Sequence, residues 1–127
     1  MSFKMVEGER ESINCPNLQH LQISDCHQLV EVGTLPDALT TLELTHCYEL
    51  RKIEWSSPLS KLRVLNLKGC QILEQFPSLE TLVSLEKLYT SDCFKLRSIR
   101  GLAHLPKLRT IRVCGCTELE ELEGVKT

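Results

Sequence analysis

Five cysteines recur along this chain at nearly constant intervals. Cys26, Cys47, Cys70, Cys93 and Cys116 are separated by 21, 23, 23 and 23 residues. Apolar residues surround each cysteine at fixed offsets, so the pattern L-x-x-L-x-L-x-x-C-x-x-L-x-x-L repeats along most of the sequence. A period of roughly 20–50 residues is typical of solenoids, in which stacked coils share one continuous core.

The copies of this pattern are close to one another. In chain order they are Leu18, Leu21, Ile23, Cys26, Leu29, Val32; then Leu39, Leu42, Leu44, Cys47, Leu50, Ile53; then Leu62, Leu65, Leu67, Cys70, Leu73, Phe76; then Leu85, Leu88, Thr90, Cys93, Leu96, Ile99; and then Leu108, Ile111, Val113, Cys116, Leu119, Leu122. Thr90 is the one departure. The agreement predicts five coils of the same shape.

The spacing within each copy predicts the local structure. The L-x-L core alternates with a period of two, which indicates a strand with one buried face. Successive strands then form a parallel sheet with leucines packed on one side and the other side open. We expect mostly turns and short 3₁₀ segments on the return path, because Pro36, Pro58, Pro77 and Pro106 fall there and proline does not fit helix interiors.

The cysteine position comes where each strand ends and the chain turns inward. A small buried side chain with a weak donor can help to satisfy backbone groups that leave the sheet there. We therefore interpret Cys26, Cys47, Cys70, Cys93 and Cys116 as a structural ladder of free thiols. Seven cysteines in the whole chain would suggest disulfides in a secreted protein, but the even spacing favours a reducing, cytoplasmic setting.

The pattern is similar to the leucine-rich repeat, with cysteine in the slot that takes Asn or Cys. The stretches Lys68-Gly69-Cys70 through Pro77 and Cys114-Gly115-Cys116 resemble the repeats of plant intracellular nucleotide-binding leucine-rich-repeat receptors, the disease-resistance proteins. The resemblance implies an α/β-type solenoid, a right-handed superhelix with its parallel sheet on a concave face. It also implies a recognition domain for pathogen or host proteins, in plant defence. The repeats of substrate adaptors are related and stay open as an alternative.

The repeat sets the expected organisation. Residues 1–17 are interpreted as the tail of a preceding repeat and its return loop, with Phe3 and Val6 in the slots of Leu119 and Leu122. Five repeats follow at 18–38, 39–61, 62–84, 85–107 and 108–125. No polar capping unit is evident at either end, so the chain is interpreted as part of a longer array. End-to-end self-association through uncapped repeats is a second hypothesis.

The strand positions between the leucines predict the contact surface for another protein. The expected contact residues are His20, Gln22, Glu43, His46, Asn66, Lys68, Lys87, Tyr89 and Arg112. Tyr and Arg are frequent interface anchors, so Tyr89 and Arg112 carry most weight.

Other classes of function fit the sequence less well. Fifteen basic against 17 acidic residues give a net charge of −2, which does not favour nucleic acid or a membrane surface. Three other sites are conceivable from residue types, but exposed polar residues are expected on a binding face in any case. They are a metal site at His20, His46, Asp25 and Glu43, a catalytic set of Ser24, Asp25 and His46, and a Cys114–Cys116 pair. We expect no cofactor, no metal and no catalysis.

Overall fold

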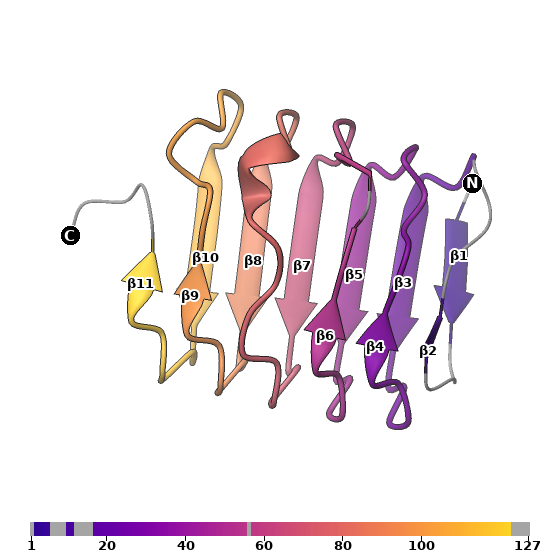
Figure 1. Ribbon diagram of the computed structural model, residues 1–127, viewed down its shortest axis with the longest axis vertical. Helices are drawn as coiled ribbons and strands as arrows, with labels where there is room; N and C mark the ends of the chain where they lie inside the picture. The colour runs from indigo at the N-terminus through magenta and orange to yellow at the C-terminus, as the bar shows by residue number, and fades with distance from the viewer. Residues whose placement is uncertain (1, 6–9, 12–16, 56, 123–127) are drawn as a thin grey trace.

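The computed structural model describes residues 2–5, 10–11, 17–55 and 57–122 of the 127-residue chain, with side chains described within 17–55 and 57–120. Figure 1 shows a solenoid in which one row of long strands lies behind a second layer of short strands and loops. This architecture, with almost no helix, confirms the predicted leucine-rich-repeat type of solenoid.

The long strands form a six-stranded parallel sheet in the order β1-β3-β5-β7-β8-β10. The strands are β1 (Ser2–Met5), β3 (His20–Ser24), β5 (Thr41–Thr45), β7 (Val64–Lys68), β8 (Lys87–Ser91) and β10 (Thr110–Cys114). Their register places equivalent repeat positions side by side, for example Leu42 opposite Leu65 and Leu65 opposite Leu88. Alternating leucines therefore stack into continuous buried rows, which is what the period of two predicts.

A second layer, here called the return layer, faces the leucine side of this sheet (Figure 1). It contains the short strands β2 (Arg10–Glu11), β4 (Glu31–Val32), β6 (Lys52–Ile53), β9 (Ser98–Ile99) and β11 (Glu121–Leu122), and the 3₁₀ helix η1 (Leu79–Thr81). The short strands pair in parallel as β2-β4-β6 and as β11-β9. The extended and 3₁₀ return path was expected, whereas its pairing into two small sheets was not.

The ladder of the return layer breaks at the coil that contains Pro77. In the preceding coil the N–H of Glu54 donates to the carbonyl of Val32 at 3.0 Å. Pro77 occupies the position equivalent to Glu54 and has no N–H to donate. Pro77 therefore removes one of the ladder bonds at this break.

Leucines from both layers meet in one core. The strand leucines lie against the return-layer leucines, and in each layer these side chains are at least nine-tenths buried. The return-layer members are Leu35, Leu59, Leu79, Leu82, Leu102 and Leu105. A parallel sheet of this kind is covered on one face only, because every described return segment runs on the same side of it (Figure 1).

The beginning of the chain differs from the expected register. β1 pairs with β3 and brings Phe3 opposite Leu21, so Phe3 takes a long-strand position rather than the slot of Leu119. Val6 lies outside the described residues. Residues 2–5 thus add a sixth strand instead of only ending an earlier coil, and β2 in turn pairs with β4. This pairing satisfies backbone groups that β3 would otherwise expose at its edge.

Candidate functional site

The outer face of the long-strand sheet, here called the strand face, carries the residues that alternate with the buried leucines. Three columns of side chains run across the strands β3, β5, β7, β8 and β10. They are His20, Thr41, Val64, Lys87 and Thr110; Gln22, Glu43, Asn66, Tyr89 and Arg112; and Ser24, Thr45, Lys68, Ser91 and Cys114. All of these side chains are exposed or half-buried. The sheet thus presents a broad, mostly polar surface.

The strand face carries a contact between two of the expected anchors. The guanidinium carbon of Arg112 lies 5.7 Å from the centre of the Tyr89 ring, within cation–π range. The two residues are direct neighbours across β8 and β10, and Lys87 begins the same strand as Tyr89. The contact holds an aromatic and a cationic group together in the middle column, where a partner would meet both.

The residue that follows each long strand from β3 to β10 adopts a left-handed backbone conformation. This turn column consists of Asp25, His46, Gly69, Asp92 and Gly115, with φ values of 54°, 55°, 69°, 53° and 73°. Its N–H groups still bond across the coils, as in the 2.7 Å bond from His46 to the carbonyl of Lys68. Asp and Gly tolerate this conformation well, which explains the D-C and G-C dipeptides of the sequence.

The metal and catalytic alternatives can be examined at the turn column. His46 Nδ1 lies 3.6 Å from Asp25 Oδ1, so these two expected residues do meet. Within the described residues, however, no three His, Cys, Asp or Glu side chains are grouped so that they could hold a metal ion. Ser24 Oγ accepts a 3.1 Å hydrogen bond from Thr45, which engages the hydroxyl of the supposed nucleophile.

The cysteine thiols run as a row beneath the turn column, and four of the five are fully buried. The thiols of Cys47, Cys70, Cys93 and Cys116 lie 3.7–3.9 Å from a carbonyl oxygen of an earlier coil, as in Cys70 to Leu44 at 3.8 Å. Cys26 lies 3.6 Å from the carbonyl oxygen of Ser24, two residues earlier, and Cys47, Cys93 and Cys116 make the equivalent local contact. The thiols therefore contact carbonyl groups near the strand ends.

Hydrogen bonding and burial shift the pKa values of these thiols in both directions. Hydrogen bonds with the thiols of Cys47 and Cys93, together with burial, raise the pKa of Cys70, and the same bonds lower the pKa of Cys47 and Cys93. Burial raises the pKa of Cys116. A raised pKa keeps Cys70 and Cys116 protonated, and the thiol form is neither the nucleophile nor the metal ligand. Cys114 is exposed on the strand face while Cys116 turns toward the core, so the two point apart.

Charged residues that the sequence analysis missed lie just before the long strands. Arg63 directly precedes β7, Glu86 directly precedes β8, and Arg109 directly precedes β10. Arg63 Nε donates to Glu86 Oε2 at 2.8 Å, and this bond lowers the pKa of the Glu86 carboxyl. A pocket of about 360 Å³ opens here, with Lys87 among its lining residues. The three residues recur at the repeat period of 23, so the stacking of coils brings their repeat position together in neighbouring coils.

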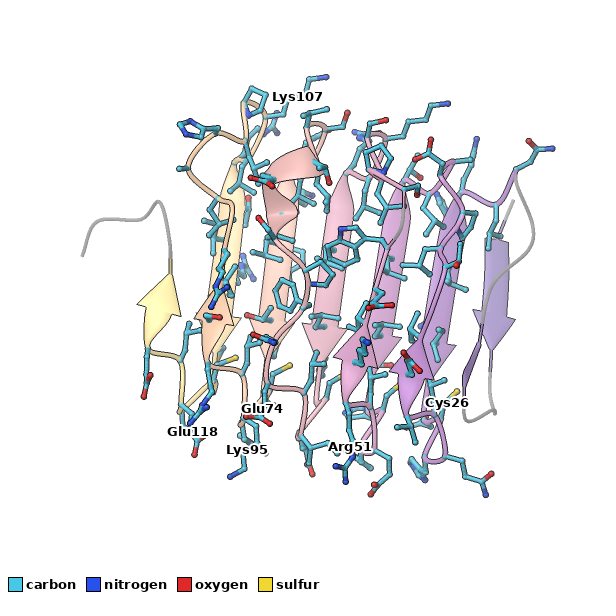
Figure 2. The ribbon with its side chains drawn as sticks, viewed as in Figure 1. Cys26, Arg51, Glu74, Lys95, Lys107 and Glu118 are labelled. Carbon is cyan, nitrogen blue, oxygen red and sulfur yellow. The ribbon has the colours of Figure 1, made fainter. Side chains whose placement is uncertain are left out.

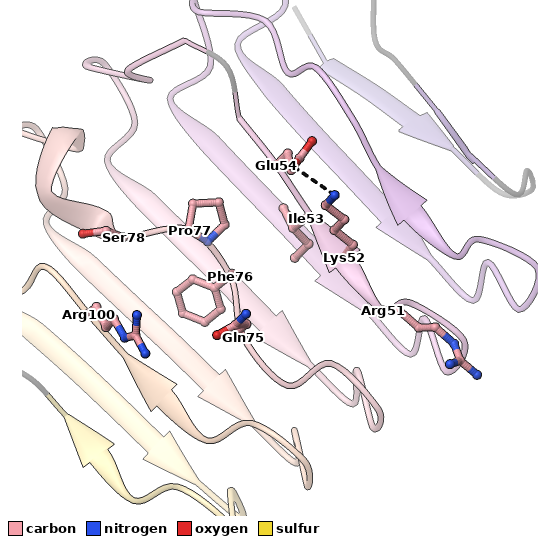
Figure 3. Close-up of a pocket in the computed structure, with 9 residues that line it drawn as sticks. All are labelled: Arg51, Lys52, Ile53, Glu54, Gln75, Phe76, Pro77, Ser78 and Arg100. Carbon is pink, nitrogen blue, oxygen red and sulfur yellow. Dashed lines mark ion pairs between the residues drawn. The ribbon is translucent and has the colours of Figure 1, made fainter.

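A second pocket lies in the return layer, at the break described above. It has a volume of about 490 Å³ (Figure 3). Ile53, Phe76 and Pro77 form its floor, but Ile53 and Phe76 are at least nine-tenths buried and offer little apolar surface. Lys52 is held by Glu54 at 3.1 Å. Trp55 is half-buried, and the centre of its ring lies 6.5 Å from that of the Phe76 ring.

Comparison with known proteins places one repeat in a described family. The family model described as Leucine Rich Repeat matches residues 61–82, which span β7, Cys70 and η1. Neither the curated proteins nor the solved structures give a match. No helix in the described part of the chain has the length and apolar character needed to cross a membrane. The matched repeat and the parallel solenoid built around it support a leucine-rich-repeat domain.

Proposed function

We propose that this protein binds another protein through the strand face. Leucine-rich repeats commonly serve in protein–protein interaction, and such solenoids are typically binding scaffolds rather than enzymes. The observation that carries the proposal is the uncovered outer face of the sheet. Parallel sheets are normally covered on both sides, so a face lined with polar side chains in ordered columns is suited to a partner.

The proposed contact set follows the columns of that face. It comprises His20, Gln22, Glu43, His46, Asn66, Lys68, Lys87, Tyr89 and Arg112. Tyr89 and Arg112 form the centre of the set, because they already contact each other and so lose little freedom when a partner covers them. The solvated polar residues around them then exclude water from the contact.

Site-specific photocrosslinking in the host cell tests this proposal. A photoreactive amino acid replaces Asn66 on the strand face or, as a matched control, Gln75 in the return layer. We expect a discrete crosslinked polypeptide from position 66 and none from position 75. The same product should disappear when Tyr89→Ala and Arg112→Glu are added, without loss of folding. A product that forms only from position 75 would show that the wrong face was chosen.

We further propose that the setting is a plant-type intracellular immune receptor, in which this array senses a pathogen or host protein. The support is the repeat form itself, with its period and its D-C and G-C turns. The six described cysteines are free, which fits a reducing compartment. The crosslinked polypeptide tests this setting: a pathogen protein or a nucleotide-binding switch domain supports it, and a metabolic or ribosomal protein contradicts it.

Self-association is a second candidate with an observation of its own. The apolar side chains of the last described coil, among them Leu108, Ile111 and Val113, are only half-buried, unlike their equivalents in earlier coils. A second copy stacked on β10 would bury them and pair its open edge. Light scattering over a hundredfold range of concentration tests this idea, since a constant monomer mass would exclude it.

A further inference from the structure

The strand face carries an uneven distribution of charge along the direction of its strands. Positive groups gather where the strands begin, in a set here called the basic edge: Arg63, Lys87, Lys107 and Arg109. The opposite edge, where the strands end, has mixed charge: Asp25 and Asp92 in the turn column, Lys68 at the end of β7, and Lys95 paired with Glu118. Lys107 and Lys95, both labelled in Figure 2, mark these two ends of the molecule.

Most cations of the basic edge have no anionic partner within the described residues. Arg63 is bonded to Glu86 at 2.8 Å, whereas Lys87, Lys107 and Arg109 take part in no ion pair there. Arg109 and Lys107 are close enough to contribute to the lowered pKa of Glu86. One carboxylate therefore faces four cations, and the edge retains an excess of positive charge.

The edge also has the shape of a site. Arg63, Lys87 and Arg109 line the pocket of about 360 Å³ together with Thr40, Thr41 and His20. Arg63 and Arg109 belong to coils two steps apart, so their backbones are separated by about 10 Å at the strand spacing of parallel sheets. Two carboxylates of one extended segment can reach both, because side chains on the same side of such a segment are about 7 Å apart.

Resting on the proposed function, we infer that the partner presents an acidic peptide segment to the basic edge, and that Glu86 competes with this segment for Arg63. Guanidinium groups favour carboxylates through paired hydrogen bonds. The excess of cations is confined to the basic edge, because charges at the far edge are mixed, so a segment with local acidic charge fits better than a uniformly charged nucleic acid. Glu86 occupies Arg63 until a partner carboxylate replaces it.

Fluorescence anisotropy with a labelled deca-glutamate peptide tests the inference on the full chain at low salt. The edge variant Lys87→Glu/Arg109→Glu removes two unpaired cations, and we expect it to weaken binding at least about tenfold. Its matched control, Lys95→Glu/Arg97→Glu, makes the same charge change where each cation already has an exposed acidic neighbour, Glu118 or Glu74. Binding by the control should stay within about twofold of the unmodified chain.

Glu86→Gln provides the most specific readout. Because it frees Arg63, we expect deca-glutamate to bind about two- to fivefold more tightly. The loss of one negative surface charge without release of Arg63 would give a smaller gain in affinity. An equal loss in the edge and control variants, or no gain with Glu86→Gln, would overturn the inference. A single-stranded oligonucleotide that binds as tightly as deca-glutamate would also overturn it. These outcomes leave photocrosslinking from position 66 unaffected, so the two proposals fail separately.

Discussion

The two layers of this solenoid differ in how far their strand pairing extends without a break. The long-strand sheet runs unbroken from β1 to β10, while the short-strand ladder of the return layer stops where Pro77 removes one N–H donor. Each long strand from β3 onward has five residues and contributes to two rows of buried side chains, whereas each short strand has two residues. The loss of one bond is therefore a larger share of the pairing for a short strand than for a long one.

This difference indicates where the stability and the function of the fold reside. The long-strand sheet fixes the columns of the strand face, since its register places equivalent residues side by side in every coil. The return layer closes the core with leucines and tolerates local variation, such as the lone 3₁₀ helix η1 beside the break. Substitutions in the two layers can be used to measure this contrast.

The largest expected difference is between two leucine truncations. Leu67 is fully buried between Leu44 and Thr90 on neighbouring strands, so Leu67→Ala should leave a cavity that rigid neighbours cannot fill. We expect it to lower the free energy of unfolding by about 2–5 kcal/mol. Leu102 lies in the return layer and is 6% exposed, so Leu102→Ala should cost less. Urea unfolding followed by the fluorescence of Trp55 measures both, and an equal or larger loss for Leu102→Ala would contradict the contrast.

Glycine substitutions should give a smaller effect in the opposite order. An added Cβ at Gly101 would lie 2.6 and 2.7 Å from the backbone nitrogens of Glu80 and Leu79, and φ is +85°. At Gly69, the turn column, it would lie 2.7 Å from the side chain of His46, with φ +69°. Both alanines are strained by the left-handed conformation, at about 1–2 kcal/mol each.

Gly101→Ala should cost more than Gly69→Ala, because the backbone at η1 cannot rotate away as the His46 ring can. Thermal unfolding of the two variants measures the order. His46→Gly in combination with Gly69→Ala serves as the control, since it removes the side-chain contact and should recover part of the loss. If the two alanine variants unfold at the same temperature, the strain comes from φ alone.

The sequence predicted the layer whose pattern extends over many residues. The alternation in Leu21–Ile23 and its later copies is enough to define the long strands, the buried leucines and the outward columns. Two-residue strands such as β4 and β6 have no period to detect, so their pairing could not be predicted. Arg63 and Glu86 stand one period of 23 residues apart, so the repeat predicts that their coils are neighbours, but it does not indicate that the two side chains bond to each other.

His46 and Phe3 show two further limits of the pattern. Asp and Gly indicate the left-handed turn in four coils, but His46 adopts the same conformation because its neighbours above and below impose the coil. The sequence pattern placed Phe3 in the slot of Leu119, whereas pairing with β3 gives it a long-strand position. Cooperation between coils, rather than local preference, decides both.

The smallest effect concerns Thr90, the one polar residue in the rows of strand leucines. It is fully buried, and its hydroxyl oxygen has no hydrogen-bond partner. Thr90→Val keeps the shape and removes the unsatisfied group, so we expect the free energy of unfolding to rise by about 1 kcal/mol. Thr45→Val is the matched control on the outer side of β5, where the hydroxyl donates to Ser24 at 3.1 Å. That loss should lower stability by about 0.5–1 kcal/mol. Urea unfolding measures both changes in the free energy of unfolding. Changes of opposite sign would show that the inner side of the long strands favours apolar groups and the strand face favours polar ones. Changes of the same sign would contradict the division of the sheet into a core side and a binding side.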